Sequence, residues 1–425
     1  MKLDFDIVVV GAGPAGLAAA CEALRLGKRV AIVDDNPRPG GQIWRQGPHT
    51  QASPPMRRMS GTLDTAENAT ILAATRVVAA PVPKALLLES DDGSARYVSY
   101  SELILATGAR ERLLPCAGWT LPGVTGAGGL QALVKGGMPV RGERVVIAGT
   151  GPLLMAALAT ARAAGANVVA VVEQATLASV LRFGLSLSAT PSKLWQAMRL
   201  TRGFAGLAYW TDSVVREVRG EGRVESVVVR RGMRDVVLEC DRLAYGYGLV
   251  PNLTLALALE CDIRAGAIAV DERQRTSMAH IWAAGECTGI GGAELACVEG
   301  HIAGLAASGV PIPPALVRTR ERWRRFAARL DEAFALGEAA REQPANDTLL
   351  CRCEDVPIGA VAGYANWRDA KLHTRCGMGP CQGRICGTAA QVYFGWDSAP
   401  PRPPFIPARI GTLLQAAPAD RSRTL

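Results

Sequence analysis

The chain of 425 residues has few aromatic residues, only four histidines and no long apolar segment. Because aromatic side chains make up 5% of it, the core has to consist mainly of Ala, Val and Leu. Its longest apolar stretches, such as residues 148–161, are too short and too rich in Gly to cross a bilayer. No signal-peptide pattern precedes the first predicted strand. We therefore expect a cytoplasmic protein, with at most a peripheral membrane contact at the inner face.

The sequence also lacks the marks of a nucleic-acid-binding protein, although its formal net charge is +8. It contains no Lys-rich block and no recognisable nucleic-acid module, so we expect no nucleic-acid partner. With 49% hydrophobic and 20% charged residues, the composition excludes wholesale disorder. The length fits about two to four domains.

Two kinds of catalytic machinery are missing as well. No cysteine pair of the C-x2-C type occurs, and residues 35–60 contain no Cys, which argues against a thiol–disulfide relay. Six cysteines are scattered singly and are expected to be small packing residues: Cys21, Cys116, Cys240, Cys261, Cys287 and Cys297. His301 is expected to pack within a helix, and the spacing suggests no partner for His49, His280 or His373. We therefore leave catalytic residues unassigned.

A strand, a Gly-rich turn and a helix open the chain. The strand pattern at residues 6–10 is followed by Gly11-Ala-Gly13-Pro14-Ala15-Gly16, a helix to residue 26 and a second strand ending at Asp34. The first Gly allows a tight turn, the second lets a pyrophosphate approach, and the third lets the helix pack on the strand. The helix N-terminus binds phosphates, and Asp34 would accept hydrogen bonds from a ribose. This unit predicts a dinucleotide site.

A second unit of the same type lies in the middle of the chain. A strand at residues 144–148 leads into Gly149-Thr-Gly151, an Ala-rich helix and a strand that ends at Glu173. Leu154 replaces the third Gly, which weakens the phosphate-site prediction. Glu173 would face a ribose 2′-hydroxyl and favours NAD over NADP. The alternative is that this second unit keeps the fold but binds another adenine nucleotide, or no nucleotide.

Three further segments are expected to organise the rest of the chain. Residues 176–210 are predicted as a helical insertion, and residues 312–346 as a linker that contains a helix. An apolar helical stripe is formed by Trp323, Phe326, Leu330 and Phe334. The arginines at 318–329 are expected on the solvated face of the same helix, with contact to an acidic partner as the alternative. Residues 398–407 are Pro-rich, which predicts an extended tail along the body or on a partner.

Five cysteines lie close together near the C-terminus: Cys351, Cys353, Cys376, Cys381 and Cys386. Their core pattern is C-x-C, twenty-seven residues and C-x4-C. Zinc sites favour C-x2-C pairs, whereas four thiolates can also hold two irons bridged by sulfides. An iron–sulfur site is favoured, and zinc or reduced thiols are the alternatives.

Three short motifs carry a resemblance to a known superfamily. They are Gly41-Gln42, Thr107-Gly108 at the end of a strand, and Gly285-Glu286 in a Gly-rich turn before a helix. In this order they resemble the two-domain flavoproteins of the pyridine-nucleotide-disulfide oxidoreductase superfamily. The resemblance implies an α/β fold with two Rossmann-like domains, the second inserted in the first, and FAD on the first fingerprint. It assigns Glu286, where the superfamily usually has Asp, to the ribityl chain.

The cysteine-rich segment closely resembles the BFD-like [2Fe–2S] domain. This resemblance implies Cys351, Cys353, Cys381 and Cys386 as ligands and leaves Cys376 without that role.

From Ile7 to about Leu414 the chain resembles the α subunits of bacterial heteromeric amine and imino-acid dehydrogenases. These include opine oxidases, D-hydroxyproline and proline dehydrogenase complexes and hydrogen cyanide synthase. The implied domains are FAD-binding (1–115 and 276–311), nucleotide-binding (116–275), linker helix (312–346), BFD-like (347–395) and Pro-rich tail (396–425).

The resemblance also implies partners. A glycine-oxidase-like flavoprotein β subunit would oxidise the C–N bond, a small γ subunit occurs in some complexes, and FMN is a further candidate at the subunit interface. The chain itself would be an FAD-dependent oxidoreductase subunit that relays electrons to an acceptor. The alternatives are a stand-alone NADH-dependent reductase of an external carrier and a non-catalytic redox- or iron-sensing protein. The sequence identifies neither the amine substrate nor the terminal acceptor.

Overall fold

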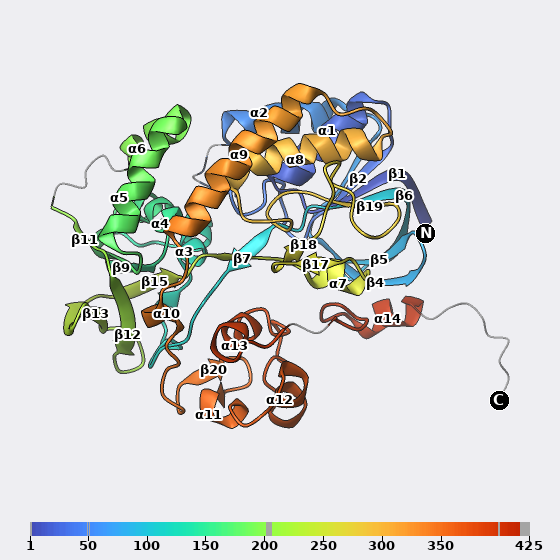
Figure 1. The fold of residues 1–425 in the computed structure, drawn as a ribbon. Coiled ribbons are helices and arrows are strands. Elements are labelled where there is room, and N and C mark those ends of the chain that lie inside the picture. Colours follow the sequence, from blue (N-terminus) through green and yellow to red (C-terminus); the bar gives the residue numbers. More distant parts are fainter. Residues whose placement is uncertain (1, 49, 51, 201–205, 398–399, 417–425) are drawn as a thin grey trace, which may run out of the picture.

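The computed structural model describes residues 2–48, 50, 52–200, 206–397 and 400–416 (Figure 1). His49 and the end of the predicted tail, residues 417–425, lie outside the described part. Within the described residues, no helix combines the length and the apolar character that a bilayer crossing needs.

The first sheet is built from the N-terminal quarter of the chain and one late strand. Its order is β3-β2-β1-β6-β5-β4, and β19 pairs with β6. The β3-β2-β1-β6-β19 part is parallel, whereas β4 and β5 form an antiparallel extension. The strands are β1 (Lys2–Val10), β2 (Val30–Val33), β3 (Ala69–Leu72), β4 (Thr75–Val82), β5 (Ala85–Ser90), β6 (Ala95–Leu105) and β19 (Ile281–Ala283). The return of the chain to this sheet through β19 agrees with the predicted fold class.

Two helices of the first sheet pack backbone to backbone. They are α1 (Pro14–Arg25) and α8 (Gly292–Ala307), which lie against each other in Figure 1. A Cβ at Gly300 would lie 2.1 Å from the carbonyl oxygen of Ala15, and one at Gly304 would lie 2.4 Å from that of Ala19. Only Gly permits so close an approach, and the contact positions the first Gly-rich turn against the turn that carries Glu286.

The second sheet has the order β11-β10-β9-β15-β8 and is parallel throughout. Its strands are β8 (Val124–Thr125), β9 (Arg144–Gly149), β10 (Asn167–Glu173), β11 (Ala208–Trp210) and β15 (Arg242–Gly246). Helices α3 (Ala127–Lys135) and α4 (Pro152–Ala163) pack on it, and a meander of β12 (Ser213–Arg219), β13 (Ser226–Arg231) and β14 (Arg234–Glu239) adjoins it. The fold is therefore α/β with two Rossmann-like sheets, as predicted.

The predicted helical insertion at residues 176–210 is helical only in part. It contains α5 (Leu177–Ser186), a short 3-10 helix (Leu187–Ala189) and α6 (Pro191–Leu200). Its last residues, however, form β11, which pairs in parallel with β10. The prediction was wrong there because pairing with a distant strand overrode the local helical pattern.

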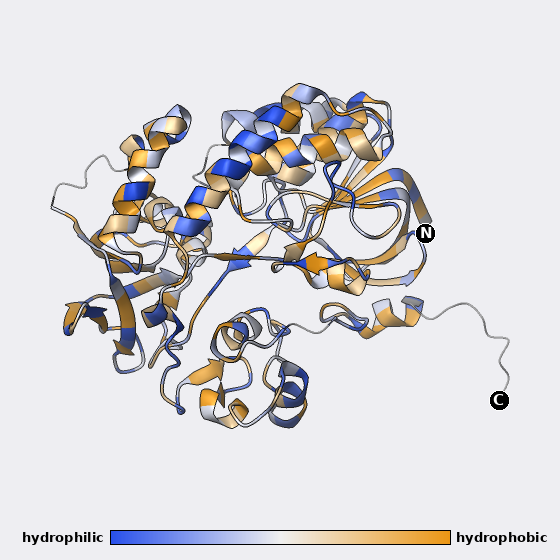
Figure 2. Cartoon of the chain, viewed as in Figure 1, coloured by the Kyte–Doolittle hydropathy of each residue, from blue (hydrophilic) through white to orange (hydrophobic). Residues whose placement is uncertain are grey.

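A helix of twenty residues, α9 (Pro314–Ala333), leads from the first sheet toward the second (Figure 1), and hydrophilic residues line much of it (Figure 2). Trp323 and Phe326 of the predicted stripe are buried. The expectation that the arginines at 318–329 are all solvated was wrong for Arg320, which is fully buried. Its guanidinium pairs with the carboxylate of Glu272 and donates to the Glu272 carbonyl over 2.6 Å.

The cysteine-rich region shares a hydrophobic core with the second sheet. It contains β20 (Leu349–Cys351), β21 (Val356–Pro357), α11 (Ile358–Val361), α12 (Trp367–Thr374) and α13 (Cys386–Phe394). The indole nitrogen of Trp119 donates to the Leu349 carbonyl over 2.7 Å, and Tyr393 donates to the Pro115 carbonyl. The tail then runs along the first sheet, where Phe405 is buried and α14 (Ile410–Ala416) follows. The tail was expected along the body of the chain or on a partner, and its described part lies along the body.

Candidate cofactor sites

The first Gly-rich turn has the geometry that a dinucleotide site needs. Gly11 has a φ of +108°, and a Cβ there would lie 2.2 Å from the Ala106 carbonyl oxygen. A Cβ at Gly16 would lie 1.8 Å from the Gly11 carbonyl oxygen. By contrast, a Cβ at Gly13 would meet nothing within 4 Å. Gly11 and Gly16 are therefore required by the protein itself, whereas Gly13 leaves open space in front of the N-terminus of α1, where a pyrophosphate binds.

Asp34 anchors this turn from the end of β2. Its carboxylate accepts hydrogen bonds from the Ala12 backbone N–H and from the backbone and side-chain N–H groups of Asn36. The side chain is buried. Its predicted contact with a ribose stays a prediction.

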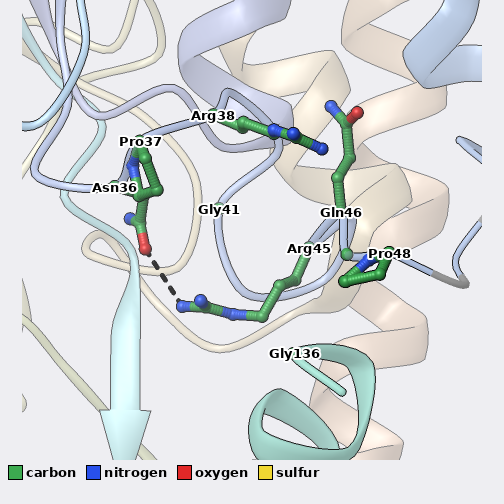
Figure 3. A pocket seen from close by; sticks show the side chains of 9 residues that line it. Asn36, Pro37, Arg38, Gly41, Arg45, Gln46, Pro48 and Gly136 are labelled. Atoms are coloured by element: carbon green, nitrogen blue, oxygen red, sulfur yellow. Dashed lines mark hydrogen bonds between the residues drawn. The ribbon is translucent and has the colours of Figure 1, made fainter.

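The loop that contains Gly41 and Gln42 lies next to the first turn. The Gly40 N–H donates to the Ala12 carbonyl over 2.7 Å, and a Cβ at Gly41 would approach the Gly13 Cα to 3.0 Å. The loop borders a pocket of about 350 Å³ that Figure 3 shows from close by. Arg45 there donates to the Asn36 amide oxygen. The pocket wall is cationic and adjoins the predicted FAD site, which suits a phosphate-bearing cofactor.

The Thr107-Gly108 turn is held by the strand that returns from the second sheet. The Thr107 hydroxyl donates to the Asn252 carbonyl over 2.8 Å, and the Asn252 side-chain amide donates to the Thr107 carbonyl over 2.9 Å. The Asn252 backbone N–H donates to the Gly108 carbonyl. The sequence motifs marked Thr107 and Gly108 but did not show that Asn252, 145 positions later than Thr107, holds them.

Arg110, which the sequence motifs did not mark, joins three parts of the chain. It belongs to β7 (Ala109–Glu111), directly after Thr107-Gly108. Its Nη1 donates to the Pro251 carbonyl and the Asn252 amide oxygen, and its Nε donates to the Arg384 carbonyl over 2.9 Å. Arg384 lies in the loop between Cys381 and Cys386. Burial lowers the pKa of Arg110 to about 10, so it stays charged at neutral pH.

The turn before α8 carries Glu286 and is held by a second carboxylate, that of Glu299. Burial raises the pKa of Glu286. In α8, Glu299 accepts hydrogen bonds of 3.1 Å from the Gly285 N–H and from the Thr288 hydroxyl. Glu299 is only 4% exposed, and burial raises its pKa to about 7. No sequence motif marked Glu299, because its role depends on the turn that it supports.

Replacement of Glu299 by Gln should make the stability of the protein less dependent on pH. A raised carboxyl pKa means that the folded state binds the proton more tightly, so wild-type stability falls as pH rises from about 4.5 to 7. The full effect corresponds to about 3 kcal/mol. Urea unfolding at pH 5 and pH 8 should show this loss in the wild type and little of it in Glu299→Gln. Equal pH slopes in the two proteins would contradict the burial argument.

The five C-terminal cysteines form one thiol network. The Sγ atoms of Cys351, Cys376 and Cys386 lie within 4.8 Å of one another, and all three residues are buried. Cys381 interacts with Cys386 and with the exposed Cys353. A Cβ at Gly379 would lie 2.4 Å from the Cys353 Cβ, so the Gly-rich turn lets the loop close over the first pair.

The chemistry of this donor set fits an iron–sulfur cluster. Hydrogen bonds from Cys376 and Cys386 hold the pKa of Cys351 well below its usual range, whereas burial raises the pKa of Cys353 and the hydrogen bond with Cys351 raises that of Cys386. A hydrogen bond from Cys386 contributes most to lowering the pKa of Cys381, to about 5. The thiolate is the form that binds metal. The predicted set of four ligands stays a prediction, and the structure adds that Cys376, which that set omits, lies in the tightest group.

The second Gly-rich turn is hydrogen-bonded to Glu173, the acidic residue at the end of β10. Glu173 accepts hydrogen bonds from the Thr150 hydroxyl over 2.7 Å, the Gly151 N–H over 2.8 Å and the Ala175 N–H over 2.9 Å. Leu154, in the place of the third Gly, is fully buried in the core between α4 and the sheet. The predicted binding of a nucleotide by Gly149, Gly151 and Glu173 stays untested.

Three histidines have partners that the spacing did not reveal. His280 and His373 both contact other side chains, and His301 is hydrogen-bonded as well as packed. His280 and His301 bond to Glu102 and Glu22 over 2.7 and 2.8 Å, and His373 stacks on Tyr364. The six scattered cysteines are free thiols, and all except the partly exposed Cys297 are buried.

Comparison with known proteins identifies the family. Residues 5–303 match the family model described as pyridine nucleotide-disulphide oxidoreductase. The chain is 33% identical to an opine oxidase subunit of Agrobacterium tumefaciens, covering 99% of this chain and 90% of that protein. It is 32% identical to the hydrogen cyanide synthase subunit HcnB of Pseudomonas protegens, covering 90% of each.

A solved structure agrees at the level of the fold. L-proline dehydrogenase from P. horikoshii matches with a TM-score of 0.68 and 19% identity, covering 97% of this chain and 80% of that one. The chain therefore belongs to the pyridine nucleotide-disulphide oxidoreductase family, together with the opine oxidase subunit and HcnB, and is an FAD-dependent oxidoreductase.

Proposed function

We propose that this chain is the electron-transferring subunit, with FAD and a [2Fe–2S] cluster, of a heteromeric dehydrogenase or oxidase. The complex would act on the C–N bond of an amino acid, an imino acid or an opine. The likeness to the opine oxidase subunit over 99% of the chain supports this class of donor. Cys351, Cys353, Cys381 and Cys386 would hold the cluster, and Gly11, Gly13, Gly16 and Gly41 would line the FAD site.

The observation that carries the proposal is the contact that Arg110 makes between the two candidate redox sites. Arg110 follows the flavin-side Thr107-Gly108 turn and donates to the Arg384 carbonyl in the Cys381–Cys386 loop. When bound, FAD would supply two-electron chemistry and the cluster one-electron chemistry. Arg110 would keep the two sites adjacent and would place a partly buried positive charge near Cys381.

The proposal needs no catalytic base in this chain. The three described histidines are engaged with neighbouring side chains. The oxidation of the C–N bond would then occur on a flavoprotein β subunit of the glycine-oxidase type. A small γ subunit and FMN at the subunit interface fit the same scheme. The chain's own residues bind, orient and separate the redox groups.

Reconstitution with a flavoprotein of the glycine-oxidase type as the partner tests this function. We expect an amino- or imino-acid substrate to bleach the flavin of this chain under anaerobic conditions only when the partner is present. A second measurement mixes the same partner with an Arg110→Ala chain. We expect the cluster to be reduced more slowly in this variant than in the wild type, because the contact between the two sites is lost.

Two outcomes would overturn the proposal. Bleaching of the isolated chain's flavin by NADH within seconds would identify a stand-alone reductase. A chain whose FAD no co-purified partner and substrate can reduce would instead point to a sensing protein.

A further inference from the structure

The residues that follow α9 cover the second Gly-rich turn. Phe334 ends that helix, and a Cβ at Gly151 would lie 3.7 Å from the Cβ and Cγ atoms of Phe334. The Phe334 ring also packs edge-on against Phe183 of α5, with ring centroids 5.2 Å apart. In Figure 1 the end of α9 reaches α4 and α5. An aromatic side chain thus lies over the N-terminus of α4, where a dinucleotide would place its pyrophosphate.

The backbone of residues 334–337 makes hydrogen bonds with polar side chains of the second Gly-rich turn and of the strand end beside it. The Gln174 side-chain amide donates to the Ala335 carbonyl over 2.8 Å, and its oxygen accepts from the Gly337 N–H over 2.9 Å. The Thr150 hydroxyl makes a weaker contact of 3.5 Å with the Phe334 carbonyl. Thr150 belongs to the Gly-rich turn, and Gln174 follows the acid that would bind a ribose. The linker therefore contacts the Gly-rich turn at the phosphate end of the site and the residue directly after the acid.

The first Gly-rich turn provides an internal comparison. Gly13, the equivalent of Gly151, is partly exposed and has open space in front of it. Gly151 is buried, and Thr150 and Gln174 are only 3% and 7% exposed. A nucleotide could reach those groups only by displacing residues 334–337. The two turns share a sequence signature, but only the first is open.

The same linker leads into the cysteine-rich region. Leu336 packs against the core that joins the second sheet to this region, and Ala340 is part of that core together with Leu350 and Cys351. Attachment of the linker to Thr150 and Gln174 therefore also limits where the candidate cluster can lie.

We infer that residues 334–337 are the resident occupant of the second nucleotide site. The retained Rossmann fold binds the chain's own linker there instead of NAD or another adenine nucleotide, and it fixes the start of the cysteine-rich region. The inference goes beyond the proposed function, because it concerns what this site binds and does not depend on a partner subunit or on cluster ligation.

Amide hydrogen exchange of the full FAD-containing chain tests this inference. With 5 mM NAD added, we expect no change at residues 334–337 or at Thr150 and Gly151. Replacement of Gln174 by Ala removes two hydrogen bonds to the linker, so we expect Gly337 to exchange about tenfold faster. Gln131→Ala is the matched control, since it removes a glutamine hydrogen bond to Thr160 in the same domain without touching the linker. It should leave Gly337 unchanged.

A second variant, Phe334→Ala, tests the same inference without relying on the Gln174 substitution. Phe334→Ala removes the ring over Gly151 from a partly exposed helix end, and should also accelerate exchange at residues 335–337. Saturable protection of Gly151 by NAD in the wild type, with faster exchange at residues 334–337, would overturn the inference. So would unchanged linker exchange in both variants. Failure of the proposed function would appear only in substrate-driven flavin reduction and would leave these exchange results as expected.

Discussion

Replacement of Cys381 by Ser is expected to abolish the iron–sulfur signals of this chain while FAD stays bound. The serine hydroxyl is a harder and less acidic ligand than a thiolate, so one iron loses its anchor. The affinity for the cluster should fall at least about 100-fold. Iron analysis, visible absorption and EPR of the reduced protein measure the loss, and the flavin spectrum shows that FAD remains.

Two further serine variants make this test specific. Cys297→Ser removes a thiol of α8 that contacts the Pro14 carbonyl and belongs to no part of the network, so it should leave the cluster spectrum intact. Cys376→Ser tests the geometry directly, because Cys376 lies within 4.8 Å of Cys351 and Cys386 but is outside the predicted ligand set. An unchanged cluster in Cys381→Ser would refute the ligand assignment. Loss of the cluster in Cys376→Ser would place Cys376 among the ligands.

Replacement of Gly13 by Ala should separate FAD binding from folding. A Cβ at this position meets no protein atom within 4 Å, and the backbone φ of −76° suits any residue. The added methyl group, however, occupies the space through which a pyrophosphate approaches the turn. We expect FAD affinity to fall at least about tenfold, which corresponds to about 1.4 kcal/mol. Equilibrium dialysis measures the affinity, and circular dichroism follows the fold.

The matched control for this prediction is Gly61→Ala. Gly61 lies in α2 (Pro54–Thr65), where an added Cβ also meets nothing within 4 Å, and it belongs to no predicted site. This variant should retain full FAD content. Equal FAD affinity in Gly13→Ala and the wild type would show that the first turn does not contact the cofactor as predicted.

Part of the site follows from local sequence because the physical constraints are local. Gly11 and Gly16 are required by backbone atoms of the same turn and of the adjacent strand, so the glycine spacing alone predicted a strand–turn–helix unit. The thiol count in the C-terminal region likewise predicted a metal centre, because ligand number and type are properties of the residues themselves.

Other features depend on residues that are far apart in the chain. Arg110 bonds to the Arg384 carbonyl across 274 positions, and Gln174 bonds to the Ala335 carbonyl across 161. No period or motif connects such residues, so sequence reasoning did not mark Arg110 and could not tell whether the second turn is open. The resemblance to the BFD-like domain left Cys376 without a ligand role, and only the packing after α12 shows how close it lies to Cys351 and Cys386.

The sequence by itself thus determined the α/β class, the two Gly-rich turns and the cysteine-rich segment, because each arises from steric or ligand properties of neighbouring residues. The tertiary structure alone decided which turn stays open. Gly13 faces free space, whereas Gly151 lies under Phe334, which comes from a helix 183 positions later in the chain. Packing between distant segments, and not the glycine pattern, therefore distinguishes the two nucleotide folds.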